Sequence, residues 1–394
     1  MRVVKSLFPI IVLLIGAFYG YQKYNQLPES AIIGINYLTH MLAIIVAGFS
    51  IRFGRSSVFF YVLLVVIVNV ILRAGWASDD LGYALVSAFL PLLLLTLTVL
   101  PDRGIFSVKA IPAYAILILV GVVSIVIVMT SPAWAAQIVL TDWLPVKYFD
   151  WTGQSQTVLI VSFATLYILL TLCILNPSLH MSAGFGVLCM LIAELHYGSA
   201  IRSLNVFGSA ALLMCLYAIL QETWRMAYLD ELTGLPGRRA LSEKFRRIGG
   251  TYTVAMLDVD HFKKFNDNFG HDAGDAVLRM IAAKMSQVSG GGQPYRYGGE
   301  EFSIVFSGKD SRESVRYLEA LREAIASKPF IIRRVGRRDE DTITKPVKNN
   351  SVTVTVSIGF ADSSGSKTSP WDVLKQSDKA LYRAKGKGRN CVSE

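Results

Sequence analysis

The hydrophobic positions of this chain divide it into two parts with different patterns. From the N-terminus to about residue 220, apolar residues form long runs, whereas beyond Glu222 charges are frequent and apolar residues recur in short, spaced patterns. A run of about 20 mostly apolar residues is long enough to cross a bilayer as a helix. The first part contains eight such runs, at 5–21, 31–50, 57–74, 81–100, 106–129, 156–176, 181–200 and 203–220. We therefore predict an all-α membrane domain of about eight transmembrane helices over residues 1–220.

The first apolar run follows Arg2 and Lys5, as the core of a secretory signal peptide follows its basic residues. It lacks a convincing small-residue cleavage site, however, and seven further runs come after it. We therefore expect an uncleaved membrane helix.

Lys and Arg in the loops predict the orientation of the membrane domain, because basic loops stay on the cytoplasmic side. The N-terminus and alternate loops carry bases, and the intervening loops carry acids with fewer bases. The bases are Arg2, Lys5, Arg52, Arg55, Arg103 and Lys109, and the acids are Glu29, Asp79, Asp80 and Asp142. With eight spans, both termini and the C-terminal domain face the cytosol.

Three polar residues lie inside the predicted spans: His40, Glu194 and His196. Ionisable residues at membrane depth are candidate ligand positions. The alternative is that they pack between helices or lie at a headgroup boundary. This part of the chain resembles no family, so an input-sensing role is inferred from the architecture alone.

Composition adds limits to this picture. The chain has 394 residues, of which 53% are hydrophobic, and a formal net charge of +10 that comes mostly from the second part. A basic domain beside a bilayer is attracted to anionic headgroups, so we expect the lipid bilayer as a partner. No nucleic-acid-binding motif accompanies the charge, and we expect no nucleic-acid partner. The cysteines form no metal-binding or disulfide pattern: they are Cys173, Cys189, Cys215 and Cys391.

The second part alternates helix and strand patterns. We predict helices over 238–248, 274–288 and 311–326, and strands at Tyr252–Leu257 and Val352–Phe360. A hairpin is expected where Tyr295–Tyr297 and Phe302–Phe306 flank Gly298-Gly299-Glu300-Glu301. The last helix is predicted to begin at Pro370, with Ser369 as N-cap and Asp372 completing a capping box.

Two acidic pairs converge in this pattern. Asp258 and Asp260 end a buried strand, and Glu300 and Glu301 lie at the hairpin tip. Mg²⁺ takes one or two protein carboxylates and fills its remaining positions with water and phosphate oxygens. The helix opened by His261 to Asn266 has free N–H groups for phosphate, and Lys385 and Arg389 are further cations. The pattern indicates a metal-dependent nucleotide enzyme, although solvated acids and bases remain the alternative for each feature taken singly.

Five ordered motifs over residues 230 to 390 are similar to those of the GGDEF family of diguanylate cyclases. The motifs are Asp230-Glu231-Leu232-Thr233-Gly234-Leu235, Asp258-Val259-Asp260-His261-Phe262-Lys263 continuing to Gly274-Asp275, Arg296-Tyr297-Gly298-Gly299-Glu300-Glu301-Phe302, Thr355-Val356-Ser357-Ile358-Gly359, and Ala380-Leu381-Tyr382 continuing to Gly388-Arg389-Asn390. The third is the GGEEF form of the family signature.

This resemblance implies a palm-like α/β domain related to class III nucleotide cyclases. It places Mg²⁺, or alternatively Mn²⁺, on Asp258, the Val259 carbonyl, Glu300 and Glu301. Glu300 is also the candidate base for the ribose 3′-hydroxyl. The resemblance assigns the guanine edge to Asn266 and Asp275, with His271 near the loop. It assigns the triphosphate to His261, Phe262, Lys263, Lys385 and Arg389.

The implied reaction condenses two GTP molecules into cyclic di-GMP and two pyrophosphates. Each domain binds one GTP, so a homodimer is needed. We expect domain boundaries of 1–220 for the membrane part, 221–229 for a linker helix and 230–394 for the cyclase. The resemblance and the spans together predict a multi-pass protein of a bacterial cytoplasmic (inner) membrane, acting in second-messenger signalling.

The sequence departs from the family pattern at two places. The R-x-x-D product-inhibition site of many members aligns with Ser289 and Gly292, so we predict no inhibition through it. The segment Arg333–Asn350 is an apparent insertion, interpreted as a solvated loop or, alternatively, a headgroup contact.

Three other functions remain open at this point. The first is a catalytically silent GGDEF domain that binds GTP or a partner as a receptor. The second is a cyclase with another product, and the third is a transporter with an appended regulatory domain.

Overall fold

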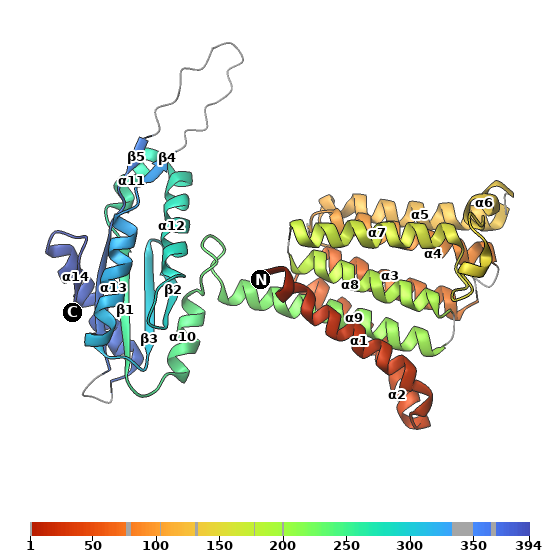
Figure 1. The fold of residues 1–394 in the computed structure, drawn as a ribbon, viewed down its shortest axis with the longest axis horizontal. Helices are drawn as coiled ribbons and strands as arrows, with labels where there is room; N and C mark the ends of the chain where they lie inside the picture. The colour runs from red at the N-terminus through yellow and green to blue at the C-terminus, as the bar shows by residue number, and fades with distance from the viewer. Residues whose placement is uncertain are drawn as a thin grey trace, which may run out of the picture. The chain divides into compact units, whose positions relative to one another are not determined.

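The computed structural model describes residues 2–75, 80–102, 104–130, 133–176, 178–198, 201–332, 350–363 and 368–394. The chain forms two compact units, Met1–Thr223 and Trp224–Glu394. Figure 1 shows the first unit as a helical bundle and the second as a sheet covered by helices. Residues 333–349 of the apparent insertion lie outside the described residues.

Eight helices of the described residues are long and apolar enough to cross a membrane, which confirms the predicted number. They are α1 (Arg2–Lys23), α2 (Glu29–Arg52), α3 (Ser56–Arg73), α4 (Asp80–Val99), α5 (Ile111–Thr130), α7 (Gln156–Leu175), α8 (Leu179–His196) and α9 (Ile201–Tyr228). Short helical elements fill the connections: η1 (Tyr24–Gln26), η2 (Val108–Ala110), α6 (Ala133–Val139) and η3 (Val146–Tyr148). Residues 221–228 of the predicted linker helix form the last part of α9, which ends at Tyr228.

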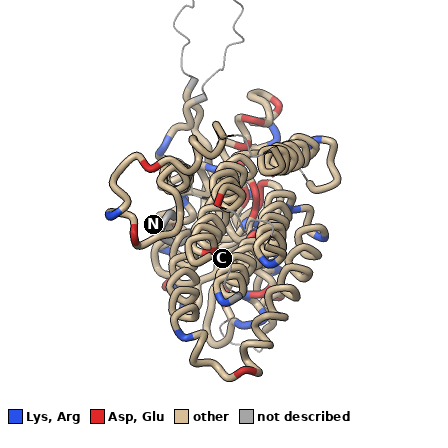
Figure 2. Tube along the Cα trace, turned by 90° about the vertical axis from the view of Figure 1, so that its right-hand side faces the viewer, with Lys and Arg blue, Asp and Glu red and all other residues tan. Residues whose placement is uncertain are grey.

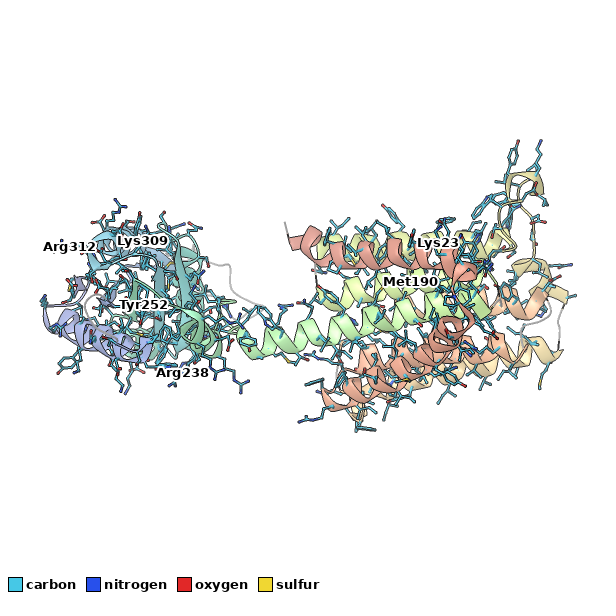
Figure 3. All side chains as sticks on the ribbon, turned by 90° about the horizontal axis from the view of Figure 1, so that it is seen from below. Lys23, Met190, Arg238, Tyr252, Lys309 and Arg312 are labelled. Carbon is cyan, nitrogen blue, oxygen red and sulfur yellow. The ribbon has the colours of Figure 1, made fainter. Side chains whose placement is uncertain are left out.

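The bundle places its largest buried side chains on its inner helices. Tyr61 of α3, Leu94 of α4, Met190 of α8 and Phe207 of α9 have almost no exposed surface; Met190 is labelled within the bundle in Figure 3. By contrast, α5 exposes a series of aliphatic side chains, among them Ile118, Leu119, Val122, Ile125 and Val126. Exposed apolar faces of this kind suit contact with lipid chains.

Charged residues are sparse along the trace in Figure 2, in keeping with a charged fraction of 17%. Three of them connect loops at one end of the bundle. Arg55, between α2 and α3, forms ion pairs with Asp102 after α4 (3.7 Å) and with Glu222 of α9 (3.6 Å). Asp102 also accepts a hydrogen bond from the backbone N–H of Ser56 (2.8 Å). These contacts join both loops to the helix that leads out of the bundle.

The second unit is built on a five-stranded sheet of order β2-β3-β1-β6-β7. Its strands are β1 (Tyr252–Val259), β2 (Gly292–Gly298), β3 (Glu301–Ser307), β6 (Val356–Asp362) and β7 (Val392–Ser393). Neighbouring strands are antiparallel except β6 and β7, which are parallel. A separate pair, β4 (Phe330–Ile332) and β5 (Asn350–Val352), flanks the segment outside the described residues.

Successive side chains of a strand point to opposite faces of the sheet, so each face has its own hydrophobic core. The helices are α10 (Arg238–Arg247), α11 (Phe262–Phe269), α12 (His271–Met285), α13 (Ser311–Ala326) and α14 (Pro370–Gly386). Ala255 and Leu257 of β1 pack with residues of α11, α12 and α13. Val254 and Met256 pack on the other face with residues of α10 and α14. The eight transmembrane helices followed by an α/β domain therefore match the predicted fold class.

Most predicted elements of this unit are confirmed, with two corrections. The predicted strand Val352–Phe360 is in fact two strands, β5 and β6, because Thr355 between them bonds to Asp260. The helix predicted at 274–288 begins earlier, at His271, after Gly270 in a left-handed conformation (φ 84°), and ends at Met285. At α14, Ser369 is the N-cap as predicted, and its hydroxyl also donates to the Asp372 carboxylate (2.7 Å).

Candidate active site

The site begins at the end of β1, the central strand of the sheet. Asp258 pairs in register with Glu301 of β3 on one side and with Ser357 of β6 on the other. Directly opposed residues of antiparallel strands point to the same face. Asp258 is therefore flanked by Glu301 and Ser357 on one face of the sheet.

The hairpin between β2 and β3 adds a third carboxylate. Gly299 (φ 47°) and Glu300 form the two-residue turn, and Gly298, the last residue of β2, pairs with Glu301, the first residue of β3. Burial raises the pKa of Glu300, and the nearby Asp258 carboxylate raises it further. Burial and Asp258 raise the pKa of Glu301 in the same way. Three acids thus share one site that disfavours their combined negative charge.

Helix α14 supplies a cation to these acids. Gly359 of β6 makes this approach possible, because a Cβ at that position would lie 1.9 Å from the backbone nitrogen of Leu381. The Lys385 ammonium is 2.9 Å from Asp258 Oδ1. Burial raises the pKa of Asp258, and the Lys385 contact opposes that rise. Lys385 therefore occupies the carboxylate in the absence of other cations.

Asp260 is held differently from Asp258, although both end the same strand. Its carboxylate accepts hydrogen bonds from the hydroxyls of Thr355 (2.8 Å) and Ser357 (2.6 Å) and from the backbone N–H of Asn390 (3.0 Å). With its oxygens bound by these three donors, Asp260 fixes the loop after α14. The preceding residue of that loop, Arg389, has a left-handed backbone (φ 67°) and an exposed side chain.

A second pocket-forming group lies on α11 and α12. The Asn266 side-chain oxygen is buried and has no hydrogen-bond partner among the described residues. Gly274 makes room for it, because a Cβ there would lie 1.9 Å from that oxygen. Asp275 follows directly and is half-buried. A buried, unpaired acceptor costs free energy unless a ligand supplies a donor.

The remaining predicted substrate residues surround the start of α11. His261 is its N-cap and has a left-handed backbone (φ 57°), Phe262 is buried, and Lys263 is exposed. His271 is the exposed first residue of α12. The side chain of Phe262 is part of the core, so only its backbone is available to a ligand.

Sequence reasoning assigned no role to an ion pair at the entry to the domain. The Arg296 guanidinium is 2.7 Å from Asp230 and also donates to the carbonyl of Gly299 in the signature turn (2.7 Å). Burial raises the pKa of Asp230, but hydrogen bonds from Thr233 and Arg296 outweigh it and leave the pKa lowered. Both residues lie in quoted motifs, yet nothing in their spacing of 66 positions predicts the contact.

The arrangement fits a metal ion bound jointly with substrate. Among the described residues no three His, Cys, Asp or Glu side chains form a metal-binding group. Mg²⁺ nevertheless needs only one or two carboxylates when phosphates complete its shell, and Asp258 and Glu300 are hard oxygen donors of that type. The raised pKa values of these acids reflect a site that a cation would stabilise.

At the predicted position of product inhibition, Ser289 is exposed and Gly292 lies in β2. A Cβ on Gly292 would lie 2.7 Å from the Phe306 ring, so a carboxylate side chain does not fit there without rearrangement. The absence of inhibition stays a prediction.

The polar residues of the spans are mostly engaged with one another. Glu194 is fully buried and accepts a hydrogen bond from Asn69 (2.8 Å). Arg73 contacts Asn69 (3.4 Å), Asn36 (3.2 Å) and Asn205 (2.5 Å). His196 contacts the hydroxyl of Thr152 (3.0 Å), and His40 lines a small cavity beside Asn69. For Glu194 these contacts favour the interhelical-packing interpretation.

Comparison with known proteins defines the class of the second unit. A family model described as "Diguanylate cyclase, GGDEF domain" matches residues 227–391. These residues are a GGDEF domain, and the palm-like α/β fold expected from the motifs is confirmed.

Particular relatives agree in this region. The chain is 36% identical over 181 residues to the response regulator PleD of Caulobacter vibrioides, covering 44% of this chain and 37% of PleD. It is 36% identical over 179 residues to the diguanylate cyclase DgcP of Pseudomonas aeruginosa, covering 43% of this chain and 24% of DgcP. Among solved structures, the coiled coil and GGDEF domain of DgcB from Caulobacter crescentus, in complex with c-di-GMP, is 32% identical, with a TM-score of 0.39 and coverage of 45% of this chain and 91% of that one. The chain thus spans well under half the length of these two curated relatives.

Proposed function

We propose that the chain is a membrane-bound diguanylate cyclase that joins two GTP molecules into cyclic di-GMP and releases two pyrophosphates. The observation that carries the proposal is the convergence of Asp258, Glu300, Glu301 and Lys385 at one end of the β1–β3 pair. The relatives named as diguanylate cyclases match over the same unit.

A divalent metal, Mg²⁺ or Mn²⁺, would be held by Asp258, the Val259 carbonyl and Glu300, with Glu301 alongside. When bound, it would neutralise negative charge on the phosphates. Lys385 is 2.9 Å from Asp258, so it would be free to contact a phosphate oxygen if that carboxylate held the metal. Arg389, Lys263 and the backbone N–H groups at the start of α11 would hold the rest of the triphosphate.

Asn266 and Asp275 would read the guanine base. The unpartnered oxygen of Asn266 accepts from a guanine N–H, and the Asp275 carboxylate accepts from another. A base without these donors leaves buried acceptors unpaired, which is a strong basis for discrimination.

The reaction needs two sites face to face. Each ribose 3′-hydroxyl attacks the α-phosphate of the other GTP, and Glu300 would be the base that takes the hydroxyl proton. Positioning supplies much of the rate in such transfers. A homodimer is therefore part of the proposal, with α9 as the element that pairs with its twin before the domain begins.

The test uses the full chain in lipid nanodiscs with GTP and Mg²⁺, and products are followed by chromatography. We expect cyclic di-GMP and pyrophosphate from the wild-type protein and none from Glu300→Ala. A matched control is Glu323→Ala, since that carboxylate is 70% exposed in a surface ion pair and should not affect turnover.

The second candidate, a GTP-binding receptor, predicts a different result from the same sample. A folded dimer that binds GTP but forms no product would support it and would contradict the cyclase. The complete acidic set at the signature turn favours the enzyme.

A further inference from the structure

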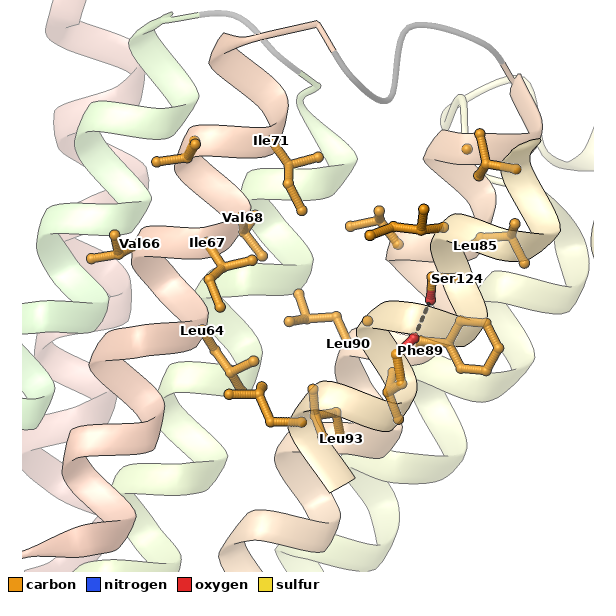
Figure 4. Close-up of a pocket in the computed structure, with 18 of the residues that line it drawn as sticks. Leu64, Val66, Ile67, Val68, Ile71, Leu85, Phe89, Leu90, Leu93 and Ser124 are labelled. Atoms are coloured by element: carbon orange, nitrogen blue, oxygen red, sulfur yellow. Dashed lines mark hydrogen bonds between the residues drawn. The ribbon is translucent and has the colours of Figure 1, made fainter. Parts of the chain in front are cut away.

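Two cavities of the membrane unit differ in the polarity of their walls. The larger, of about 570 Å³, lies between α3, α4 and α5 and is shown in Figure 4. Its walls are aliphatic or aromatic apart from Ser124, whose hydroxyl donates to the Val120 carbonyl within its own helix (2.8 Å). Among the described lining residues, Ser124 is the one with a polar side chain and its hydroxyl is already bonded, so a lipid chain suffices to fill this cavity.

The second cavity, of about 450 Å³, is enclosed by α1, α4, α7, α8 and the segment before α7. We call it the Gln154 cavity. Its walls are mostly apolar and aromatic, including Phe18, Trp151, Phe163 and Tyr197. Ligand cavities of proteins are typically of this size, largely apolar and equipped with a few polar groups.

Two of its lining residues carry buried polar atoms with no hydrogen-bond partner among the described residues: Gln154 Oε1 and Ser87 Oγ. Ser87 is 1% exposed. The Gln154 side chain is held in place because its Nε2 donates to the Leu195 carbonyl (2.8 Å). An anchored amide acceptor and a serine hydroxyl, both without a partner among the described residues, therefore belong to residues that line a mostly apolar cavity.

The charge of a suitable ligand can be inferred from the side chains that line the cavity. Among the described residues no Lys, Arg, Asp or Glu lines the cavity, and the titratable side chains that do are His196, Cys189 and Tyr197. The neighbouring Glu194 bonds to Asn69. A charged ligand would have no counter-charge in the cavity, and burying it would be costly.

The chain path places this cavity at one end of the bundle. The short connection 176–178 brings Leu175 and Leu179 together, so Gln156 and His196 lie at the opposite end. Helix α9 starts at that same opposite end and leaves the bundle at the other, where Thr223 ends the unit. Trp151, Gln154 and His196 of the cavity wall thus lie near the end of the bundle opposite to Thr223.

We propose that the Gln154 cavity binds an uncharged, largely apolar small molecule that carries a hydroxyl or N–H donor. The donor bonds to Gln154 Oε1, the polar atom of the ligand accepts from Ser87, and the aromatic walls hold its apolar body. This binding site would give the membrane unit its input.

The test measures binding of 4-hexylphenol and 4-hexylanisole to the full chain in nanodiscs by titration calorimetry, with empty nanodiscs subtracted. The two probes have the same apolar body, but only the phenol has a donor. We expect saturable binding of the phenol, about tenfold tighter than the anisole, as one buried hydrogen bond gives. Equal affinities, or no saturable binding of the phenol, would overturn the proposal.

Ser87→Ala tests the same site without endangering the fold, because it removes a buried hydroxyl that has no partner. We expect it to weaken phenol binding several-fold and to leave thermal stability unchanged or raised. Gln154→Met should abolish the difference between phenol and anisole. Ser124→Ala in the other cavity is the matched control and should bind like the wild-type protein. If Ser87→Ala and Ser124→Ala behave alike, the site is wrong.

Discussion

Asp258 and Glu194 are both buried carboxylates, one in each unit, and the two units treat them differently. Asp258 is 6% exposed and meets the Lys385 ammonium directly, beside two further acids. Glu194 has no exposed surface, accepts a hydrogen bond from the Asn69 amide and has a second oxygen for which the described part of the chain supplies no partner. The carboxylate of Asp258 is thus paired with an ammonium group that another cation could replace, and that of Glu194 is paired with an amide.

The difference shows which surroundings allow a buried carboxylate to exchange its partner. The Lys385 side chain is 34% exposed, so in the proposed reaction its ammonium would move to a phosphate and leave Asp258 to a metal. The surroundings of Glu194 are closed, because a Cβ on Gly208 would lie 2.9 Å from the Asn69 amide nitrogen. Burial of a carboxylate is common to both units, and an exchangeable, partly solvated partner is specific to the catalytic one.

The sharpest test of this comparison exchanges each carboxylate for its amide. Asp258→Asn should reduce cyclic di-GMP synthesis by about 10²–10³-fold, because an amide is a poor ligand for a divalent metal. Glu194→Gln should leave turnover within about threefold, because a neutral amide tolerates the same interior. Turnover of both variants is measured in nanodiscs at saturating GTP. Similar losses in the two would remove the distinction.

Lys385→Met sharpens the account of the exchangeable cation. Loss of one charge-assisted contact to the triphosphate should raise KM for GTP about 10–100-fold. Lys387→Met is the control two residues away, with its ammonium on Ser393 (3.3 Å), and should not change KM. Steady-state kinetics separate the two, and an unchanged KM in Lys385→Met would contradict the assignment.

Asn69→Leu tests the closed site. It removes the one described donor to Glu194 and should destabilise the bundle by about 1–3 kcal/mol, the cost of a buried polar group without a partner. The measurement is chemical unfolding in detergent, followed by tryptophan fluorescence. Glu194→Leu in the same background should recover part of the loss, and no recovery would mean that Asn69 acts through packing alone.

The smallest expected effect concerns the ion pair at the domain entry. The pKa of Asp230 is lowered in the folded state, so its contribution to stability is present above its ordinary pKa and is lost as the pH falls below it. Arg296→Met should therefore lower the Tm of the GGDEF unit at pH 6, by about 3 °C for a single partly buried pair, and by less at pH 3. An equal difference at both pH values would show that the pair is not the cause.

Much of the second unit could be predicted because its motifs follow neighbouring strands. Asp258 ends a buried run and Glu300 lies at a glycine turn, so a sheet brings them together without detailed geometry. The supports of Asp260 could not be predicted in the same way. Thr355, Ser357 and Asn390 reach it from 95 to 130 positions away, across pairings that no single pattern encodes.

In the membrane unit, the number of helices could be predicted from the sequence, but the contacts of the polar residues could not. Span number follows from length and hydropathy, but the partners of polar residues do not, because apolar helix faces pack in many equivalent ways. Asn69 and Glu194 are 125 positions apart. The unpaired Ser87 and Gln154 atoms carry no signal in the sequence, since only the folded cavity shows that nothing reaches them.

Helix α9 belongs to both units and has a mechanical consequence. It runs for 28 residues from Ile201 to Tyr228 without a break, a rod of about 42 Å at the usual rise per residue. Each residue in such a rod adds about 100° of turn as well as length. One inserted residue would therefore swing everything beyond it by more than a quarter turn, whereas seven would nearly restore the original direction. In the proposed homodimer, the angular phase of this helix, more than its reach, would therefore be the quantity that the membrane unit delivers.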